Sequence, residues 1–301
     1  DNAFATSGGV ATGANTFAAS GGVASQSNAI AIGSGSKGAG ESALALGKST
    51  QAKSSKSIAV GEGATADGTA TIAIGAGNTA TGWGSSAIGK NVQVTKERST
   101  ALGWDLTVDQ AAATLVGYNS QVHANQGTGL GSTINIESAA QYGTGIGYQV
   151  DVTGKNAVAI GSSGDLGTHT AAKATDAVAV GTATVASGEA AIAIGKKAAA
   201  SNDNSIAIGT NATSSDSAAI AIGYDSKAGN TGTVAIGYGA NVTGYTSVAI
   251  GNSATATGGT SVVIGDGASS TVGLGTALGR GAKANHEGSV ALGAQSETSA
   301  A

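Results

Sequence analysis

The sequence contains no cysteine, no proline and no methionine among its 301 residues. Without cysteine the chain can form neither disulfides nor zinc–thiolate sites, and it has no thiol nucleophile. Without proline, nearly every backbone amide can donate a hydrogen bond to a neighbouring strand. The absences therefore exclude several kinds of chemistry and favour a chain built from hydrogen-bonded strands.

Charged and aromatic residues are scarce, at 11% and 3% of the chain. The longest purely apolar runs, such as Ala218 to Ile222, are about five residues, too short to span a bilayer or to serve as a signal sequence. These short runs predict a soluble segment. Because the sequence has no methionine and begins at Asp1, we expect a mature or excised segment whose export and anchoring parts lie elsewhere.

Basic clusters are also missing. The formal net charge is −4 and no basic cluster is larger than the pair Lys196 and Lys197. Proteins that bind nucleic acids need concentrated positive charge to neutralise phosphates. The sequence therefore predicts no nucleic-acid partner.

Glycine, in contrast, is abundant, with 51 residues, and it recurs on a fixed schedule. A glycine closes an apolar triplet nineteen times between Gly33 and Gly293, and sixteen of the eighteen intervals are fourteen residues long. The other two intervals are sixteen residues (131 to 147) and twenty residues (161 to 181). A strict period predicts a solenoid. Fourteen residues hold two short strands and two turns, so we predict stacked coils joined by parallel strand pairing.

The irregular parts of the pattern predict the organisation of the chain. Residues 1–29, with Phe4 and Phe17 thirteen positions apart, are expected to form degenerate capping coils at the N-terminal end. Residues 30–301 are expected to form the repeat body. We predict a small insertion near 132–146 and a larger one at 162–177, which protrudes as a loop.

The residue just before each marker glycine is Ile, Leu or Val in all nineteen coils, and we predict that this position, Ile222 included, lies in the core. Five consecutive coils carry Ser or Thr three residues before the marker. They do so at Ser86, Thr100, Thr114, Thr128 and Thr144. Their second strands are bulky, as at Val92 and Val94, which we interpret as an exchange of volume within one shared interior.

Two residues before the marker, alanine stands in fifteen of the nineteen coils. Alternate residues of a strand point to opposite sides, so the prediction is that this column faces outward. An apolar outward column needs a partner, and we predict that sister copies press against it. The predicted inter-chain residues are Ala31, Ala45, Ala59, Ala73, Ala193, Ala207, Ala221, Ala235 and Ala249.

Units such as SIAIG (205–209), TVAIG (233–237) and SVAIG (247–251) resemble the head repeats of trimeric autotransporter adhesins, the YadA-like head. The resemblance covers about residues 28–298 and implies an all-β, left-handed parallel β-roll (a β-solenoid) that forms a homotrimer. It also implies display at the cell surface outside the outer membrane of a Gram-negative bacterium. The stalk and anchor that the family carries are expected in C-terminal parts beyond this segment.

No motif predicts catalysis or a bound cofactor. The stretch GSGSKG (33–38) matches a dinucleotide-binding pattern but is followed by another coil in place of the helix that such a site requires. His123, His169 and His286 lie in different coils and form no metal pair. We expect no enzyme activity, no metal and no cofactor, and the sequence leaves open an anion on the trimer axis.

The position after the marker glycine carries charged residues in some coils, which indicates exposure, and aromatic residues in others. Large amphipathic rings make good contact residues. We hypothesise that these rings, together with His169 in the predicted loop, form the adhesive surface. The candidates are Trp104, Tyr118, Tyr148, Tyr224, Tyr238 and His169.

The leading functional hypothesis is a multivalent adhesin head that attaches a bacterium to extracellular matrix proteins, to host or bacterial cells, or to abiotic surfaces. The segment itself is not expected to insert into a membrane. The alternatives are a structural spacer of a surface fibre, an ice-binding solenoid, and an acyltransferase with hexapeptide repeats. An ice-binding face needs an unbroken Thr ladder, which Lys37 and Gln51 interrupt. The acyltransferases use coils of about eighteen residues, unlike these.

Overall fold

The computed structural model describes residues 2–163 and 168–299, and these residues form strands and turns without any helix. The chain divides into two units, Asp1–Gly147 and Tyr148–Ala301. Each unit is a stack of coils in which strands pair in parallel with the corresponding strands of the next coil.

In the first unit most coils contain two short strands. These are β1 (Phe4–Thr6), β2 (Val10–Ala11), β3 (Phe17–Ala19), β4 (Val23–Ala24), β5 (Ile30–Ile32), β6 (Lys37–Gly38), β7 (Leu44–Leu46), β8 (Gln51–Ala52), β9 (Ile58–Val60), β10 (Thr65–Ala66), β11 (Ile72–Ile74) and β12 (Thr79–Ala80). In the next five coils one strand runs through the marker glycine. These longer strands are β13 (Ser86–Val94), β14 (Thr100–Val108), β15 (Thr114–Val122), β16 (Thr128–Ile136) and β17 (Thr144–Val152), the last of which contains the boundary between the units.

The second unit continues with short strands. They are β18 (Val158–Ser162), β19 (Thr170–Ala172), β20 (Val178–Thr182), β21 (Val185–Ala186), β22 (Ile192–Ile194), β23 (Ala199–Ala200), β24 (Ile206–Ile208), β25 (Thr213–Ser214), β26 (Ile220–Ile222), β27 (Lys227–Ala228), β28 (Val234–Ile236), β29 (Asn241–Val242), β30 (Val248–Ile250), β31 (Thr255–Ala256), β32 (Val262–Ile264), β33 (Ser269–Ser270), β34 (Thr276–Leu278), β35 (Lys283–Ala284) and β36 (Val290–Leu292).

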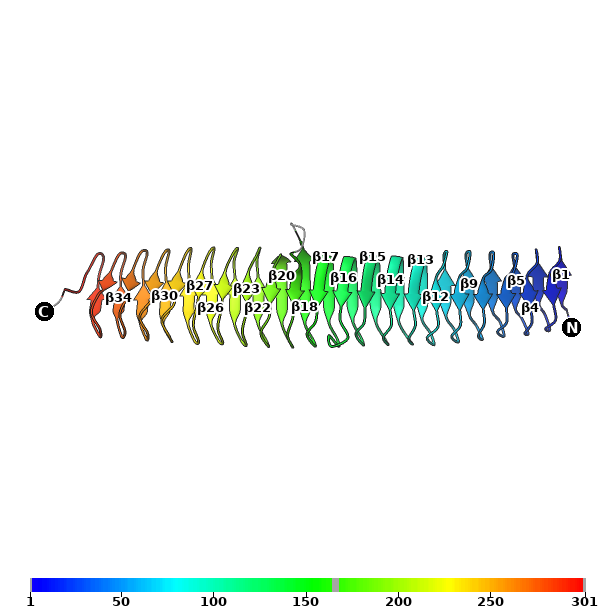
Figure 1. Ribbon diagram of the computed structural model, residues 1–301, viewed down its shortest axis with the longest axis horizontal. Coiled ribbons are helices and arrows are strands. Elements are labelled where there is room, and N and C mark those ends of the chain that lie inside the picture. The colour runs from blue at the N-terminus through cyan, green and yellow to red at the C-terminus, as the bar shows by residue number, and fades with distance from the viewer. Residues whose placement is uncertain (1, 164–167, 300–301) are drawn as a thin grey trace. The chain divides into compact units, whose positions relative to one another are not determined.

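The register of the ladders repeats the sequence period. Within the second unit Ile206 pairs with Ile220, and Ile220 with Val234, fourteen residues further along the chain. The backbone amides follow the same rule, since Ile220 N donates to Thr233 O and Gly223 N to Ile208 O. Figure 1 shows successive coils of this unit in chain order. The prediction of an all-β parallel β-solenoid with fourteen-residue coils is confirmed.

The structure reverses the two faces of the first strand. Ala221 is fully buried inside the single chain, whereas Ile220 and Ile222 on either side of it are only half-buried and point outward. The prediction that Ile222 and the other residues before the markers form the core is wrong. A two-stranded coil this short is one side-chain layer thick. Its interior therefore accepts methyl-sized side chains and leaves the larger ones outside.

The alanines predicted to contact sister copies are consequently core residues of one chain. All nine have no exposed surface in the single chain: Ala31, Ala45, Ala59, Ala73, Ala193, Ala207, Ala221, Ala235 and Ala249. Their assignment to the inter-chain contact is wrong. The side chains of the first strand do alternate between the two faces, as predicted. The alanines, however, point inward, and the large apolar residues beside them point outward.

Exchange of volume does occur inside the coils, but between positions other than those predicted. Leu115 takes the place of an inward alanine, and in the next coil Gly129 stands at that position. A Cβ atom on Gly129 would lie 2.7 Å from Leu115 Cδ1 and 3.4 Å from Ile134 Cγ2. The leucine therefore fills the space that the glycine leaves open. The Ser and Thr residues of these coils, such as Thr114, point outward and take no part in the exchange.

Most polar side chains inside the coils find backbone partners, the buried hydroxyls of Ser36 and Ser85 being exceptions. Buried Thr71 donates to Gly68 O at 2.7 Å, and buried Ser205 bonds Asn202 O at 2.5 Å. Asn78, which has no exposed surface, donates from Nδ2 to Gly89 O at 3.0 Å and accepts from Val92 N at 2.9 Å. Asn78 thereby joins a coil with two short strands to the first coil with one long strand.

The irregular intervals fall between strands. The turn at 137–143, between β16 and β17, accommodates the two extra residues of the sixteen-residue interval. Of the predicted insertion at 162–177, residues 164–167 lie outside the described residues. The ladder resumes at Thr170, where β19 pairs with Val150–Val152, so residues from Thr170 onward are regular coil. At the N-terminal end, Phe4 pairs with Phe17 in a thirteen-residue register.

Candidate functional site

The outward side of the first strands carries a column of large apolar side chains in each unit. Ile194 is 38% exposed and Leu278 is 43% exposed in the single chain. The same position is exposed in both units at Leu46, Ile74, Leu102, Leu130, Ile160, Ile250 and Ile264. Single exposed apolar residues are common on proteins, but a continuous column on one sheet face is typical of a contact surface. We call this surface the apolar face.

Aromatic residues stand beside the apolar face, at the position after the marker glycine. Tyr224 and Tyr238 stack with ring centroids 5.1 Å apart, and Trp104 meets Tyr118 edge-on at 5.7 Å. The Lys90 ammonium lies 4.9 Å from the centroid of the Trp104 ring. The predicted exposure of these residues, and of Tyr148, agrees with the structure. Neighbouring coils thus build pairs of rings that no single coil could supply.

Two histidines are hydrogen-bonded to aspartates of the preceding coil. His123 Nδ1 lies 2.7 Å from Asp109 Oδ2 in the first unit, and His169 Nδ1 lies 2.5 Å from Asp151 Oδ2 in the second. In both pairs the two side chains are about one-third exposed. Each carboxylate fixes the orientation of its imidazole ring and leaves Nε2 to other partners. His123 Nε2 is occupied by Gln121 Oε1 at 2.9 Å.

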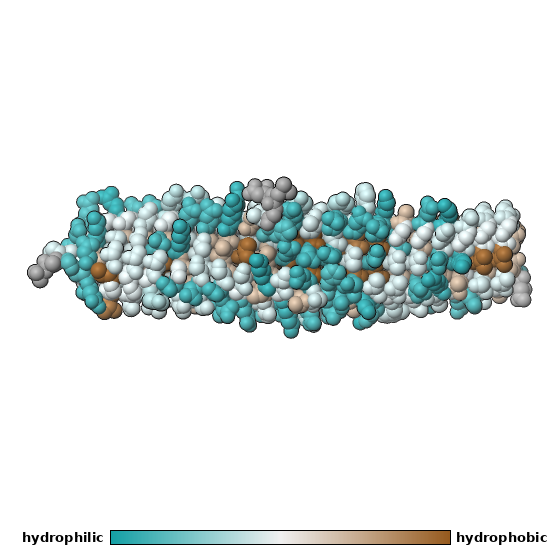
Figure 2. Space-filling model, in the orientation of Figure 1, coloured by the Kyte–Doolittle hydropathy of each residue, from teal (hydrophilic) through white to brown (hydrophobic). Residues whose placement is uncertain are grey.

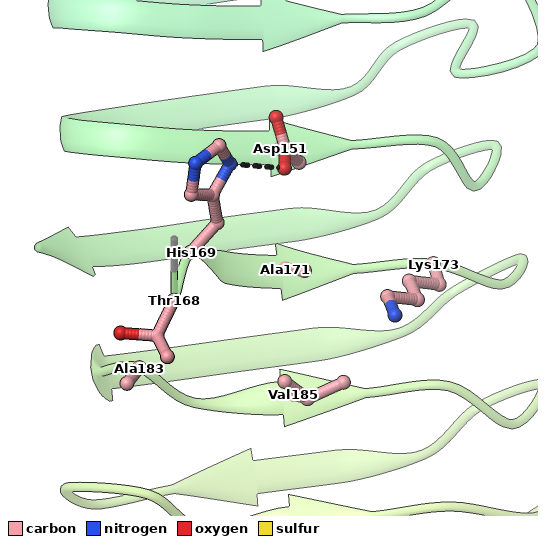
Figure 3. A pocket seen from close by; sticks show the side chains of 7 residues that line it. All are labelled: Asp151, Thr168, His169, Ala171, Lys173, Ala183 and Val185. Atoms are coloured by element: carbon pink, nitrogen blue, oxygen red, sulfur yellow. Dashed lines mark hydrogen bonds and ion pairs between the residues drawn. The ribbon is translucent and has the colours of Figure 1, made fainter. Parts of the chain in front are cut away.

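The pair of His169 and Asp151 lies at the edge of an open cavity of about 390 Å³ in the second unit. The lining residues are Asp151, Thr168, His169, Ala171, Lys173, Ala183 and Val185. Figure 3 shows the imidazole directed at Asp151 at one end and the Lys173 side chain at the other, with Ala171 and Val185 between them. The cavity therefore combines charged rims with an apolar floor.

Sequence reasoning singled out His169 but missed its partner Asp151 and also Lys173, which lines the same cavity. A signal was present in the sequence. In the second unit, the outward position of the second strand is polar in every described coil except three consecutive ones, which carry Ala171, Val185 and Ala199. This apolar break coincides with the long twenty-residue interval. Together the two irregularities mark the site.

The described residues contain no cluster of three or more His, Cys, Asp or Glu side chains that could hold a metal ion. Among the same residues, no helix is long and apolar enough to cross a membrane. Figure 2 shows apolar side chains reaching the surface in small patches on the face in view. The surfaces on which a function can be built are thus the apolar face, the aromatic pairs and the cavity at His169.

The chain is a repetitive β-solenoid made of short parallel coils. Its coils have an alanine-lined interior, and in most of them a large apolar residue stands on each side of the alanine. Comparison with known families places the chain more narrowly: it belongs to the family described as the YadA head domain repeat. The matches span residues 39–64, 52–78, 66–91, 80–105, 172–198, 186–212, 200–226, 217–240, 243–268 and 274–296, together more than half of the chain. A search of curated proteins found no match.

The family result agrees with the resemblance inferred from the AIG-type triplets. YadA head domains are extracellular parts of trimeric autotransporter adhesins, and neither the family nor this fold is typical of enzymes. The matches leave out residues 106–171. This unmatched stretch contains coils with bulky interiors, such as that of Ile134 and Ile136, and the first half of the twenty-residue interval.

Proposed function

We propose that the chain is the head of a bacterial surface adhesin, that it assembles as a homotrimer through its apolar face, and that it attaches cells to matrix proteins, other cells or abiotic surfaces. The stalk and membrane anchor lie in other parts of such a protein. The proposal needs no catalytic group and no cofactor.

The observation that carries the proposal is the half-exposed column of Ile, Leu and Val. In the second unit, Ile222, Ile236 and Ile250 stand in register on three successive coils, with further apolar residues two positions earlier in each strand. Covering such residues stabilises an assembly by about 25 cal/mol per Å² of apolar surface removed from water. Every coil repeats the contact, so small contributions accumulate along the stack.

The occupant we propose for this face is another copy of the same chain. A polar ligand could not cover the isoleucine side chains with apolar surface. A sister copy can, because it presents the same apolar column with the same spacing between coils. Three copies around one axis can each cover the apolar face of the others. The trimeric nature of the adhesins in this family favours that number.

For attachment we propose the exposed aromatic pairs. Tyr238 is 61% exposed and Tyr224 is 45% exposed, while their stacking fixes the rings in place before any contact is made. Rings held in this way lose little conformational freedom on binding. Three chains would present each pair three times, and multivalent attachment can exceed the affinity of a single site by about 10²–10⁴.

Assembly is tested by adding charge to the apolar face. We expect the triple variant Ile222→Glu, Ile236→Glu, Ile250→Glu to reduce the mass measured by light scattering from three chains to one, since the carboxylates would be buried between copies. The matched control is Thr213→Glu, Asn241→Glu, Thr255→Glu, which adds the same number of carboxylates to outward positions of second strands. A control that dissociates as readily as the first variant would overturn the assignment of the interface.

A further inference from the structure

We propose that the cavity at His169 binds one acidic sugar residue, a sugar ring that carries a carboxylate and free hydroxyl groups. The site gives the proposed adhesive function a ligand class and rests on that function for its biological role. The binding itself can be measured independently of assembly and of attachment.

Within residues 2–163 and 168–299, the cation at the rim of the cavity has no ion-pair partner. Lys53 and Lys48 pair with carboxylates of the next coil, but Lys173 takes part in none of the ion pairs of the described residues. Its side chain is exposed and lines the cavity. An unpaired ammonium beside an open cavity favours an anionic ligand group, and a charge-assisted hydrogen bond is the strongest contact that the site can offer.

The imidazole supplies the second polar contact. Because Nδ1 of His169 is engaged by the Asp151 carboxylate, the neutral ring carries its hydrogen on Nδ1 and its lone pair on Nε2. Nε2 then accepts a hydrogen bond from a ligand hydroxyl. The Asp151 carboxylate lies at the His169 end of the open cavity and Lys173 at the other end, so distance and solvent screening weaken its repulsion of an anion held at Lys173.

The floor of the cavity sets the shape of the ligand. Ala171 and Val185 are neighbours in the ladder and interrupt a column that is otherwise polar in this unit, apart from Ala199 beside them. A flat apolar floor of this size suits the C–H face of a single sugar ring. No aromatic residue lines the cavity, so the stacking that would select a nucleobase is missing among the described residues.

The size and the openness of the site agree with this ligand. A cavity of about 390 Å³ lies at the lower end of the range found for small-molecule sites, roughly 300–1,000 Å³. The cavity is open to solvent. One sugar residue, at the end of an acidic polysaccharide or within it, can therefore enter the cavity while the neighbouring sugars stay outside. Asp151, Thr168, His169 and Ala171 lie outside the family matches and the other lining residues lie inside the match 172–198, so the cavity forms at the edge of a matched region.

The test uses the full chain and two probes that differ only in the carboxylate, methyl β-D-glucuronide and methyl β-D-glucoside. We expect the glucuronide to bind with a dissociation constant of about 1 mM, as followed by NMR titration, and to bind more weakly as salt is added. Lys173→Gln should weaken this binding about 10-fold. The control Lys227→Gln removes another exposed lysine of the same unit, from β27, and should leave the binding unchanged.

A second variant tests the floor. Val185→Trp fills the cavity from an outward position and should abolish binding, and the melting temperature of each variant reports whether the fold is kept. Equal binding of both probes, equal losses for Lys173→Gln and Lys227→Gln, or no binding of the glucuronide at about 10 mM would each overturn the proposal. Binding of N-acetyl-aspartate without binding of the glucuronide would also overturn it, in favour of an acidic peptide. Loss of trimer assembly would leave these outcomes unaffected.

Discussion

At the scale of single residues, the tight corners of the coil depend on backbone conformations that few residues adopt. The marker glycines other than Gly161 have φ between 110° and 149°, a range that side chains strongly disfavour. Other corner positions, such as Ala218 and Asn211, have φ near 55°, in the left-handed region that Asn and Gly tolerate best. The two kinds of corner therefore differ in how strictly they require glycine.

This difference can be measured at two glycines of neighbouring coils. Gly223 has φ +133° and a Cβ atom there would lie 2.3 Å from Gly237 O, whereas Gly239 has φ +61° and its nearest neighbour would be Ser253 Oγ at 3.7 Å. We expect Gly223→Ala to reduce the free energy of unfolding by about 3 kcal/mol or more, and Gly239→Ala by only about 1 kcal/mol. Chemical denaturation of both variants checks the ranking, and equal losses would contradict it.

At the scale of strands, the interior is a single layer in which each coil adapts to the next. The long strands β13 to β17 tolerate Val, Leu and Ile inside because neighbouring positions vary in volume from coil to coil. Ser120 shows the same adaptation in polar form, since its hydroxyl donates to Tyr118 O and accepts from Ile134 N, at 2.8 and 2.9 Å. The serine side chain replaces a backbone acceptor where two adjacent coils do not match.

The pair of Leu115 and Gly129 provides a double-mutant test of this packing. Leu115→Ala should cost about 3 kcal/mol because it leaves a cavity in a fully buried layer. Gly129→Ala should also destabilise, since its new methyl group would lie 2.7 Å from Leu115 Cδ1. The double variant should lose less than the sum of the two, because the added methyl group enters the vacated space. Strict additivity of the unfolding free energies would show that the two side chains do not share that space.

The period of the triplets was sufficient to predict the solenoid, because a fourteen-residue repeat permits only short strands and turns. It could not decide which face of a strand points inward, since Ile-Ala-Ile alternates equally well in either sense. The deciding signal lay in the second strand, where Ile134 accompanies Gly129 and Ser120 accompanies Leu115. A large residue at one of these positions accompanies a small residue at the other, which indicates that both positions point into the same interior. The cavity at His169 required the fold, because Asp151 and Lys173 come from different coils.

At the scale of the whole molecule, repetition turns a weak contact into a strong one. A single half-exposed isoleucine or a single tyrosine pair contributes little. The repeat presents the apolar face on every coil, and assembly would present each aromatic pair once in every chain. The proposed function therefore depends on two separable surfaces, one that joins the copies and one that meets the target.

The separation of these surfaces predicts the behaviour of an aromatic variant. Tyr224→Ala with Tyr238→Ala should leave the trimeric mass unchanged and lower attachment to a collagen-, fibronectin- or plastic-coated surface about 10-fold or more, because the paired rings act once in each of three chains. Two other exposed residues of the same unit, substituted as Lys227→Ala and Ser215→Ala, provide the matched control. Attachment to every surface at the level of the unaltered chain would exclude the tyrosine pair from adhesion. A fall in mass in the aromatic variant would instead place the rings at the contact between copies, because rings that stand beside the apolar face can extend it.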